Sequence, residues 1–121
     1  MIHEWLWRIA IDPGDVYDGD TLRCTIDRGF NDVSANRKIR LAGIDTPELR
    51  GVERAEGLQA RDAARDWVTE AVTGEAFPFR MRTVKLSGKY GRIVATVWRP
   101  DDLQSLNAWL LEHGFAQEVD W

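Results

Sequence analysis

Residues 40–51 read RLAGIDTPELRG, and the rest of the fold has to be arranged around this stretch. An apolar run ends there in Asp45, Thr46, Pro47 and Glu48. A residue that precedes proline avoids the helical region, so Thr46 and Pro47 turn the chain out of a strand directly after Asp45. We therefore expect Asp45 and Glu48 at the end of a strand, where loops commonly carry functional residues.

The residues before these acids alternate as in a half-buried strand over 38–44. Ile39 and Leu41 lie on one face of such a strand, whereas Arg40 and Ala42 lie on the other. Arg40 therefore points away from these apolar residues, and its guanidinium needs an anionic partner. This stretch alone leaves open a purely structural pair between the arginine and a carboxylate at the end of the sheet.

Other strands are predicted by the same period of two. Leu22, Cys24 and Ile26 alternate with polar residues, and the tryptophan-rich start of the chain alternates in the same way. Residues 29–36 include several turn formers and are expected to form a mobile loop. The predicted strands cover residues 5–11, 21–27, 38–44, 77–84 and 92–98.

Two helices are predicted by apolar residues at helical spacing. The first has an apolar stripe over residues 60–72, and Gly74 is placed to end it. The second is expected to run from residue 101 or 102 to Gly114. Its core-facing residues would be Leu103, Leu106, Trp109 and Leu110. The order of elements fits an α+β, mostly β domain, in which a five-stranded antiparallel barrel or curled sheet is packed by two helices.

Length and composition limit the class of protein. With 121 residues, of which 44% are hydrophobic, the chain is expected to form one domain over residues 1–121. The single cysteine, Cys24, excludes an intrachain disulfide and is expected to be a buried thiol. The net charge of -4 argues against a protein that merely coats nucleic acid, but it does not exclude a locally acidic site that holds a cation.

Features of a membrane protein or a signal peptide are missing from the sequence. Apolar runs stay well below the roughly 18 residues of a membrane span. Glu4, Asp12 and Asp15 stand where a signal peptide would be basic or apolar. We therefore expect a cytoplasmic protein with no membrane partner, and a monomer by default. A secreted form processed from a longer precursor, or a phage origin, stays open.

A second acidic stretch, Asp18-Gly19-Asp20, opens the strand at 21–27. Two carboxylates across one glycine can converge on one cation if the glycine adopts a conformation closed to most residues. The alternative is an ordinary Asp-Gly turn with solvated acids. If Asp20 approaches Asp45, four carboxylates including Glu48 share one pocket, and their repulsion raises their pKa values unless a cation neutralises them. Ligands that are all oxygen select a hard ion, with calcium first and magnesium or manganese next.

A third polar stretch, SGKYGR, covers residues 87–92 and is predicted to form a turn with Lys89 and Tyr90 at its tip. Arg92 then begins the next strand, where its guanidinium could reach a pocket. An aromatic ring beside two cations suits stacking of a base above phosphate contacts, and the alternative is a hairpin with a polar tip. The basic residues of this region form either a patch or a solvated strand and turn: Arg80, Arg82, Lys85, Lys89 and Arg92.

The three stretches occur in the order VYDGDT, RLAGIDTPE and KYGR, and LNAWLLEHGFA follows them. Together they resemble the staphylococcal nuclease (thermonuclease) family over about residues 15–117. The resemblance implies a five-stranded OB-fold-like barrel with helices. It also implies a calcium-dependent phosphodiesterase that hydrolyses DNA and RNA with little sequence preference.

The resemblance further implies which residues hold the metal ion. Asp20, Asp45 and the backbone carbonyl of Thr46 would be its ligands, and Asp18 would be an accessory acid close to the ion. Sequence spacing by itself does not assign these roles.

The resemblance also implies the residues that act on the phosphate. Glu48 would be the general base for the attacking water, and Arg40 and Arg92 would bind the phosphate. Lys89 and Tyr90 would contact nucleic acid, with Tyr90 as the stacking residue. A nucleic-acid-binding or protein-binding module on the same scaffold is the alternative function, because fold alone does not determine activity.

Overall fold

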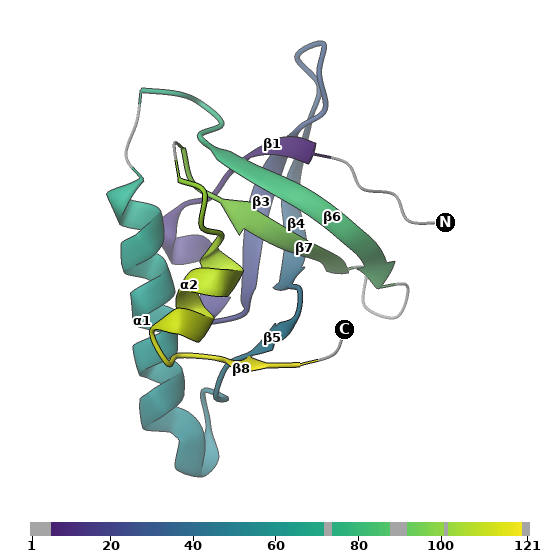
Figure 1. Ribbon diagram of the computed structural model, residues 1–121. Helices are drawn as coiled ribbons and strands as arrows, with labels where there is room; N and C mark the ends of the chain where they lie inside the picture. The colour runs from purple at the N-terminus through teal and green to yellow at the C-terminus, as the bar shows by residue number, and fades with distance from the viewer. Residues whose placement is uncertain (1–5, 72–73, 88–91, 101, 120–121) are drawn as a thin grey trace.

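The computed structural model describes residues 6–71, 74–87, 92–100 and 102–119, with only the backbone described for 84–87 and 92. Its centre is a barrel in which every strand is hydrogen-bonded to two neighbours (Figure 1). Around the barrel the strands are β1 (Leu6–Ala10), β6 (Phe79–Ser87), β7 (Arg92–Trp98), β4 (Val33–Leu41) and β3 (Thr21–Asp27). Strand β3 pairs with β1 and closes the ring. The predicted five-stranded, OB-fold-like barrel is therefore confirmed.

The barrel differs from the predicted antiparallel barrel at one pair of strands. Strands β4 and β7 pair in parallel, with Arg40 opposite Val94, whereas the other barrel pairs are antiparallel. The reason is geometric, because strand direction cannot alternate all the way round a closed ring with an odd number of strands. The prediction of a wholly antiparallel barrel was therefore wrong for this pair.

The remaining elements surround the barrel. They are η1 (Pro13–Asp15), β2 (Val16–Asp18), β5 (Ile44–Asp45), η2 (Gly51–Glu53), α1 (Arg54–Glu70), α2 (Leu106–Glu112) and β8 (Gln117–Glu118). Figure 1 shows α1 beside the barrel, with α2 between α1 and the barrel strand β7. Strands β5 and β8 form a separate antiparallel pair. Within the described residues, no helix combines the length and apolar character needed to cross a bilayer.

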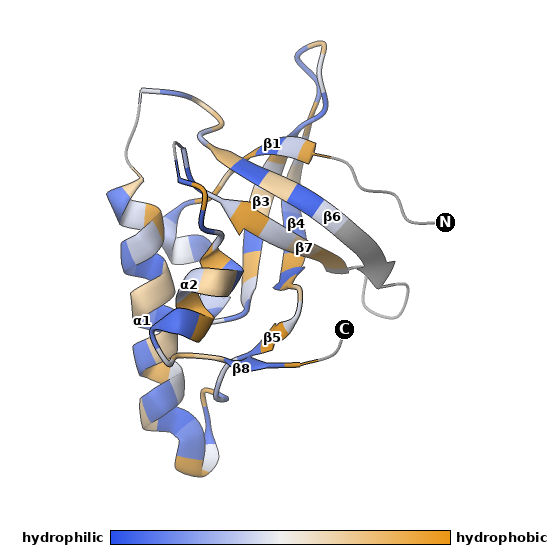
Figure 2. Cartoon of the chain, in the orientation of Figure 1, coloured by the Kyte–Doolittle hydropathy of each residue, from blue (hydrophilic) through white to orange (hydrophobic). Residues whose placement is uncertain are grey.

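The hydrophobic core fills the barrel and extends to α1. The predicted stripe is buried at Ala60, Ala64, Trp67 and Val68. Trp67 stacks on Phe79 of β6, with ring centroids 5.8 Å apart. Figure 2 shows apolar and hydrophilic residues interspersed along α1, as expected for a helix with one buried face. Buried residues on the barrel strands include Ile9, Cys24, Ile39, Met81 and Val97.

Two strand boundaries differ from the prediction. β4 begins at Val33, inside the stretch expected to be a loop. Phe30 and Asn31 adopt positive φ angles of 57° and 62°, so the chain reverses tightly and soon pairs with β3 again. The predicted continuation of this strand is interrupted at Gly43, whose φ of 75° separates β4 from β5.

Both helices differ from the prediction: α1 begins earlier, at Arg54, and α2 is shorter than predicted. α1 ends at Glu70, before the predicted end at Gly74. α2 begins at Leu106 rather than at residue 101 or 102, because the Ser105 side chain caps it by accepting a backbone N–H at 3.0 Å. Leu103 therefore precedes the helix and is fully exposed, so its predicted place in the core was wrong.

Candidate active site

The candidate site lies where the turn between β2 and β3, the end of β4, and β5 meet (Figure 1). In the β3–β4 pair, Thr21 lies opposite Arg40, so the strand register brings the Asp-Gly-Asp turn beside the arginine. The backbone N–H of Leu41 also donates to the carbonyl oxygen of Asp20 at 2.9 Å. Ordinary sheet pairing therefore joins two of the three polar stretches.

Gly19 allows the Asp-Gly-Asp turn to approach the DTPE segment. A Cβ atom added at Gly19 would lie 2.6 Å from Cγ2 of Thr46 and 2.9 Å from Cβ of Ala60. The φ of Gly19 lies outside the left-handed region, so the condition of an unusual backbone conformation is not what requires a glycine here. The glycine is needed because the neighbouring side chains leave no room for a Cβ.

Arg40 connects the two acidic stretches. Its Nη2 atom lies 3.2 Å from Oδ2 of Asp20 and 3.1 Å from Oδ1 of Asp45. Its Nη1 atom donates to the carbonyl oxygen of Leu41 at 3.1 Å. Only 6% of the Arg40 side chain is exposed. The structure therefore brings together Asp20, Arg40 and Asp45, which we call the Arg40 cluster.

Asp20 is held by further hydrogen bonds. The backbone N–H of Thr46 donates to its Oδ2 atom at 2.9 Å, and the Thr21 hydroxyl donates to its Oδ1 atom at 3.1 Å. The side-chain hydroxyl of Thr46 is buried and makes no hydrogen bond within the described part of the chain. A buried polar atom without a partner is uncommon, and here it lies next to the carboxylates of the candidate site.

The acids around Arg40 respond differently to their surroundings. Burial, followed by the hydrogen bond and charge of Asp20, raises the pKa of Asp18 to about 6. Burial also acts to raise the pKa of Asp20, but hydrogen bonds from Asp18 and the Thr46 N–H, with the charge of Arg40, outweigh it and lower that pKa. The pKa of Asp45 is raised by desolvation and by the charge of Asp20, against the opposing charge of Arg40.

These residues fit a divalent cation in donor type and in charge. When Asp18, Asp20 and Asp45 are all ionised, Arg40 neutralises one of three negative charges, and the two that remain match one divalent ion. The carboxylate oxygens are ligands preferred by hard ions such as calcium. As the side chains stand in the described residues, no group of three acidic, histidine or cysteine residues is arranged to hold a metal. Arg40 instead bridges two of the carboxylates.

Glu48 lies outside the Arg40 cluster. Its side chain is 71% exposed, and its Oε2 atom lies 3.9 Å from Nε of Arg50. It nevertheless lines a groove of about 410 Å³ together with Asp45 and Thr46. The structure therefore places Glu48 beside the Arg40 cluster, where it faces open space. Among the described residues, no hydrogen bond or ion pair joins its side chain to the side chains of the cluster.

Two further acids in this groove were missed by sequence reasoning. Glu53 and Glu56 line it, and Oε2 of Glu53 accepts the backbone N–H of Glu48 at 3.1 Å. Gly57 follows them, and a Cβ there would lie 2.3 Å from the carbonyl oxygen of Glu48. The signal available in the sequence was their place at the start of the helix that follows the DTPE segment.

The remaining predicted site residues lie at the β6–β7 turn. Arg92 begins β7 with its backbone opposite Ser87, but its side chain lies outside the described part of the structure. Lys89 and Tyr90 lie entirely outside the described residues. The predictions for these three side chains therefore stay predictions.

The comparisons with known proteins agree with the barrel fold. A family model described as staphylococcal nuclease homologue matches residues 38–120. Because this match covers more than half of the chain, the protein belongs to the staphylococcal nuclease homologue family. A sequence search among curated proteins found no match.

Proposed function

We propose that the protein is a calcium-dependent phosphodiesterase that hydrolyses DNA and RNA with little sequence preference. One observation carries this proposal: a buried guanidinium in contact with carboxylates from two separate strand ends. A nuclease needs a hard cation and a forked hydrogen-bond donor near the same phosphate. The carboxylates of the Arg40 cluster offer ligands for the cation, and the Arg40 guanidinium is the forked donor. Membership of the nuclease homologue family supports the same assignment.

The proposed calcium ligands are Asp20, Asp45 and the backbone carbonyl of Thr46, with Asp18 as the accessory acid. Magnesium or manganese is the second choice. These ions also prefer oxygen ligands, but they require a more regular coordination geometry than calcium does. Bound at these residues, the cation would act as a Lewis acid on a phosphate oxygen. The hydrogen bonds of Asp20 to Thr46 and Thr21 keep this carboxylate oriented before the cation binds.

The proposed chemistry needs a proton acceptor and donors for the phosphate. Glu48 accepts the proton of a water whose oxygen attacks phosphorus, and its exposed position in the groove gives that water access. Arg40 and Arg92 donate to the phosphate oxygens as negative charge builds on them. The bond to the leaving oxygen breaks, and that oxygen is protonated from solvent.

The test is a cleavage assay on single-stranded DNA and on RNA, with calcium, with magnesium and with chelator. We expect cleavage with calcium and none with chelator. Arg40→Ala and Glu48→Gln should each lower turnover by about a hundredfold to a thousandfold, as removal of a preorganised catalytic group does. Glu70→Gln is the matched control for Glu48→Gln, because Glu70 is also an exposed glutamate but lies at the end of α1.

Other outcomes separate the alternatives. Binding of oligonucleotide without cleavage under any ion would favour the non-catalytic binding module. Equal cleavage by the wild type, Arg40→Ala and Glu48→Gln would contradict the proposed site. Loss of activity in Glu70→Gln as large as in Glu48→Gln would contradict the specific role of Glu48.

A further inference from the structure

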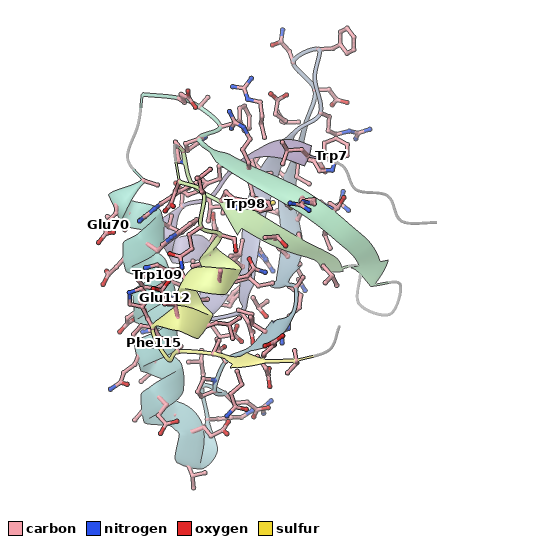
Figure 3. The ribbon with its side chains drawn as sticks, viewed as in Figure 1. Trp7, Glu70, Trp98, Trp109, Glu112 and Phe115 are labelled. Carbon is pink, nitrogen blue, oxygen red and sulfur yellow. The ribbon has the colours of Figure 1, made fainter. Side chains whose placement is uncertain are left out.

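The outward face of β6 and β7 carries a group of basic and aromatic side chains. Arg82 lies opposite Thr96, and Arg80 lies opposite Trp98, so these side chains share one face of the strand pair. The guanidinium carbon of Arg82 lies 5.1 Å from the centroid of the Trp98 ring. We call Arg80, Arg82 and Trp98 the Arg82–Trp98 platform. Figure 3 labels Trp98 at the β6–β7 strand pair.

The platform borders a groove of about 610 Å³ that lies apart from the candidate active site. Its charged lining residues are Arg80, Arg82, Arg99, Glu75 and Asp102. Asp102 already pairs with Arg99 at 3.0 Å. Arg82 has no ion pair with a carboxylate among the described residues, although the chain as a whole is acidic. A local excess of arginine in an acidic protein is complementary to an anionic partner.

The platform is on the same side of the sheet as Arg40. Arg40 lies opposite Val94 in the β4–β7 pair, and neither belongs to the hydrophobic core cluster inside the barrel. Trp98 follows Val94 by four positions on β7, so both point to the outer face. At about 3.3 Å per residue the separation along the strand is about 13 Å.

We propose that the Arg82–Trp98 platform binds single-stranded nucleic acid away from the cleavage point. A base stacks on the surface formed by the Trp98 ring and the Arg82 guanidinium, since both planar groups accept a stacked base. The charges of Arg82 and of the adjacent Arg80 contact the neighbouring phosphates. A peptide of acidic residues would use the arginines but has no aromatic ring to stack on the indole, so the tryptophan favours nucleic acid. The choice of ligand rests on the proposed nuclease function.

The test measures binding without hydrolysis. Fluorescence anisotropy of a labelled oligothymidylate is recorded in chelator. The oligonucleotide has about 12 nucleotides, a length within the range that one OB-fold covers. Arg82→Gln and Trp98→Leu should each weaken binding by about tenfold. The matched control is Arg61→Gln on α1, which removes the same charge away from the platform and should bind like the wild type.

Salt dependence separates the two contributions. Each phosphate contact to a single strand contributes about 0.7 to the slope of log affinity against log salt. Arg82→Gln should therefore lower the slope by up to about 0.7, whereas Trp98→Leu should weaken binding at an unchanged slope. Circular dichroism of both variants confirms that they are folded, and Arg82→Gln changes only an exposed side chain.

The outcomes distinguish this proposal from the proposed nuclease function. If both platform variants bind and cleave like the wild type while the wild type is active, the platform proposal fails and the nuclease proposal stands. If the wild type binds without cleaving and both variants bind weakly, the platform stands and the nuclease proposal fails. Displacement of the oligonucleotide by polyglutamate, at a lower concentration than by unlabelled oligothymidylate, would identify an acidic protein as the partner and overturn the proposal.

Discussion

Two clusters within the described residues have one arginine between two carboxylates, and their surroundings differ. In the Arg40 cluster the arginine contacts Asp20 and Asp45 at 3.2 and 3.1 Å. In the second cluster Arg99 contacts Glu70 and Asp102 at 3.2 and 3.0 Å. Figure 3 shows Glu70 near the end of α1, so the second cluster ties this helix to the chain after β7.

The two clusters differ in burial and in charge balance. The Arg99 guanidinium lies 5.2 Å from the Trp67 ring centroid, and Glu70 is largely exposed, so solvent screens this cluster. The pKa of Asp102 is lowered, first by the N–H of Gln104 and also by Arg99, which shows that its negative charge is satisfied.

The Arg40 cluster has an additional acid, Asp18, whose pKa is raised. Similar arginine–carboxylate geometry therefore has two uses, and in the second cluster it holds α1 against the chain after β7. In the other it leaves negative charge that a cation can neutralise.

The largest expected effect comes from removing the buried arginine. Arg40→Ala leaves the Asp20 carboxylate buried without the guanidinium that pairs with it, so the free energy of unfolding in chelator should fall by about 3 kcal/mol. Urea unfolding followed by circular dichroism measures it. Calcium should recover part of the loss if the remaining carboxylates bind it. An unchanged unfolding midpoint would show that Arg40 does not neutralise buried charge.

Closing the space at Gly19 should disturb the Arg40 cluster from a different side. In Gly19→Ala the new Cβ would overlap Thr46 and Ala60, and overpacking of this kind costs about 2 kcal/mol. Thermal unfolding measures the loss. Gly14→Ala is the matched control, because a Cβ at Gly14 meets nothing within 4 Å. Equal stability of the two variants would contradict the close approach of the turn to Thr46.

The pH dependence of stability should reveal the excess acid. Because the pKa of Asp18 is raised from 3.8 to about 6, the folded state binds a proton more tightly, so stability in chelator should fall as pH rises from about 4 to about 6. The raised pKa of Asp45 acts in the same direction. The lowered pKa of Asp20 stabilises above the unfolded value and acts at lower pH.

The control for the pH effect is Asp18→Asn. Its stability should vary less between pH 4 and pH 6 than that of the wild type, as followed by urea unfolding at each pH. Saturating calcium should also flatten the wild-type profile. A wild-type stability that rises over this pH range would reverse the predicted sign and contradict the excess of negative charge.

The smallest expected effect belongs to the second cluster, in which the Arg99 side chain is 23% exposed and that of Glu70 is 69% exposed. Arg99→Ala should lower the free energy of unfolding by at most about 1 kcal/mol, because ion pairs within reach of solvent contribute little. The loss should shrink as salt is added, since screening has already weakened the pairs. Urea unfolding at low and high salt measures both. A loss as large as that of Arg40→Ala would remove the distinction between the two clusters.

Much of the fold could be predicted from local patterns. The period of two located the barrel strands, and the apolar stripe over residues 60–72 located α1. The start of α2 was harder to predict, because both Pro100 and Ser105 can mark the beginning of a helix, and the structure uses Ser105. The break at Gly43 was missed because an isolated glycine in a strand pattern does not reveal its φ.

The candidate site was predictable in its members more than in their contacts. The sequence indicated Asp20, Arg40 and Asp45, and the structure places them together. It did not indicate that Glu48 would face a groove shared with Glu53 and Glu56. Those acids belong to no motif, and their position depends on how the DTPE loop packs on α1.

The sequence by itself determined which residues form strands and where polar residues interrupt them, because periodicity and the restrictions of proline and glycine act over a few residues. Only the tertiary structure decided that β4 and β7 are parallel, that Arg40 lies between two carboxylates, and that Trp98 lies on the same face of the sheet as Arg80 and Arg82. Those features arise from ring closure and strand register. Both depend on contacts between segments far apart in the chain, which no local pattern encodes.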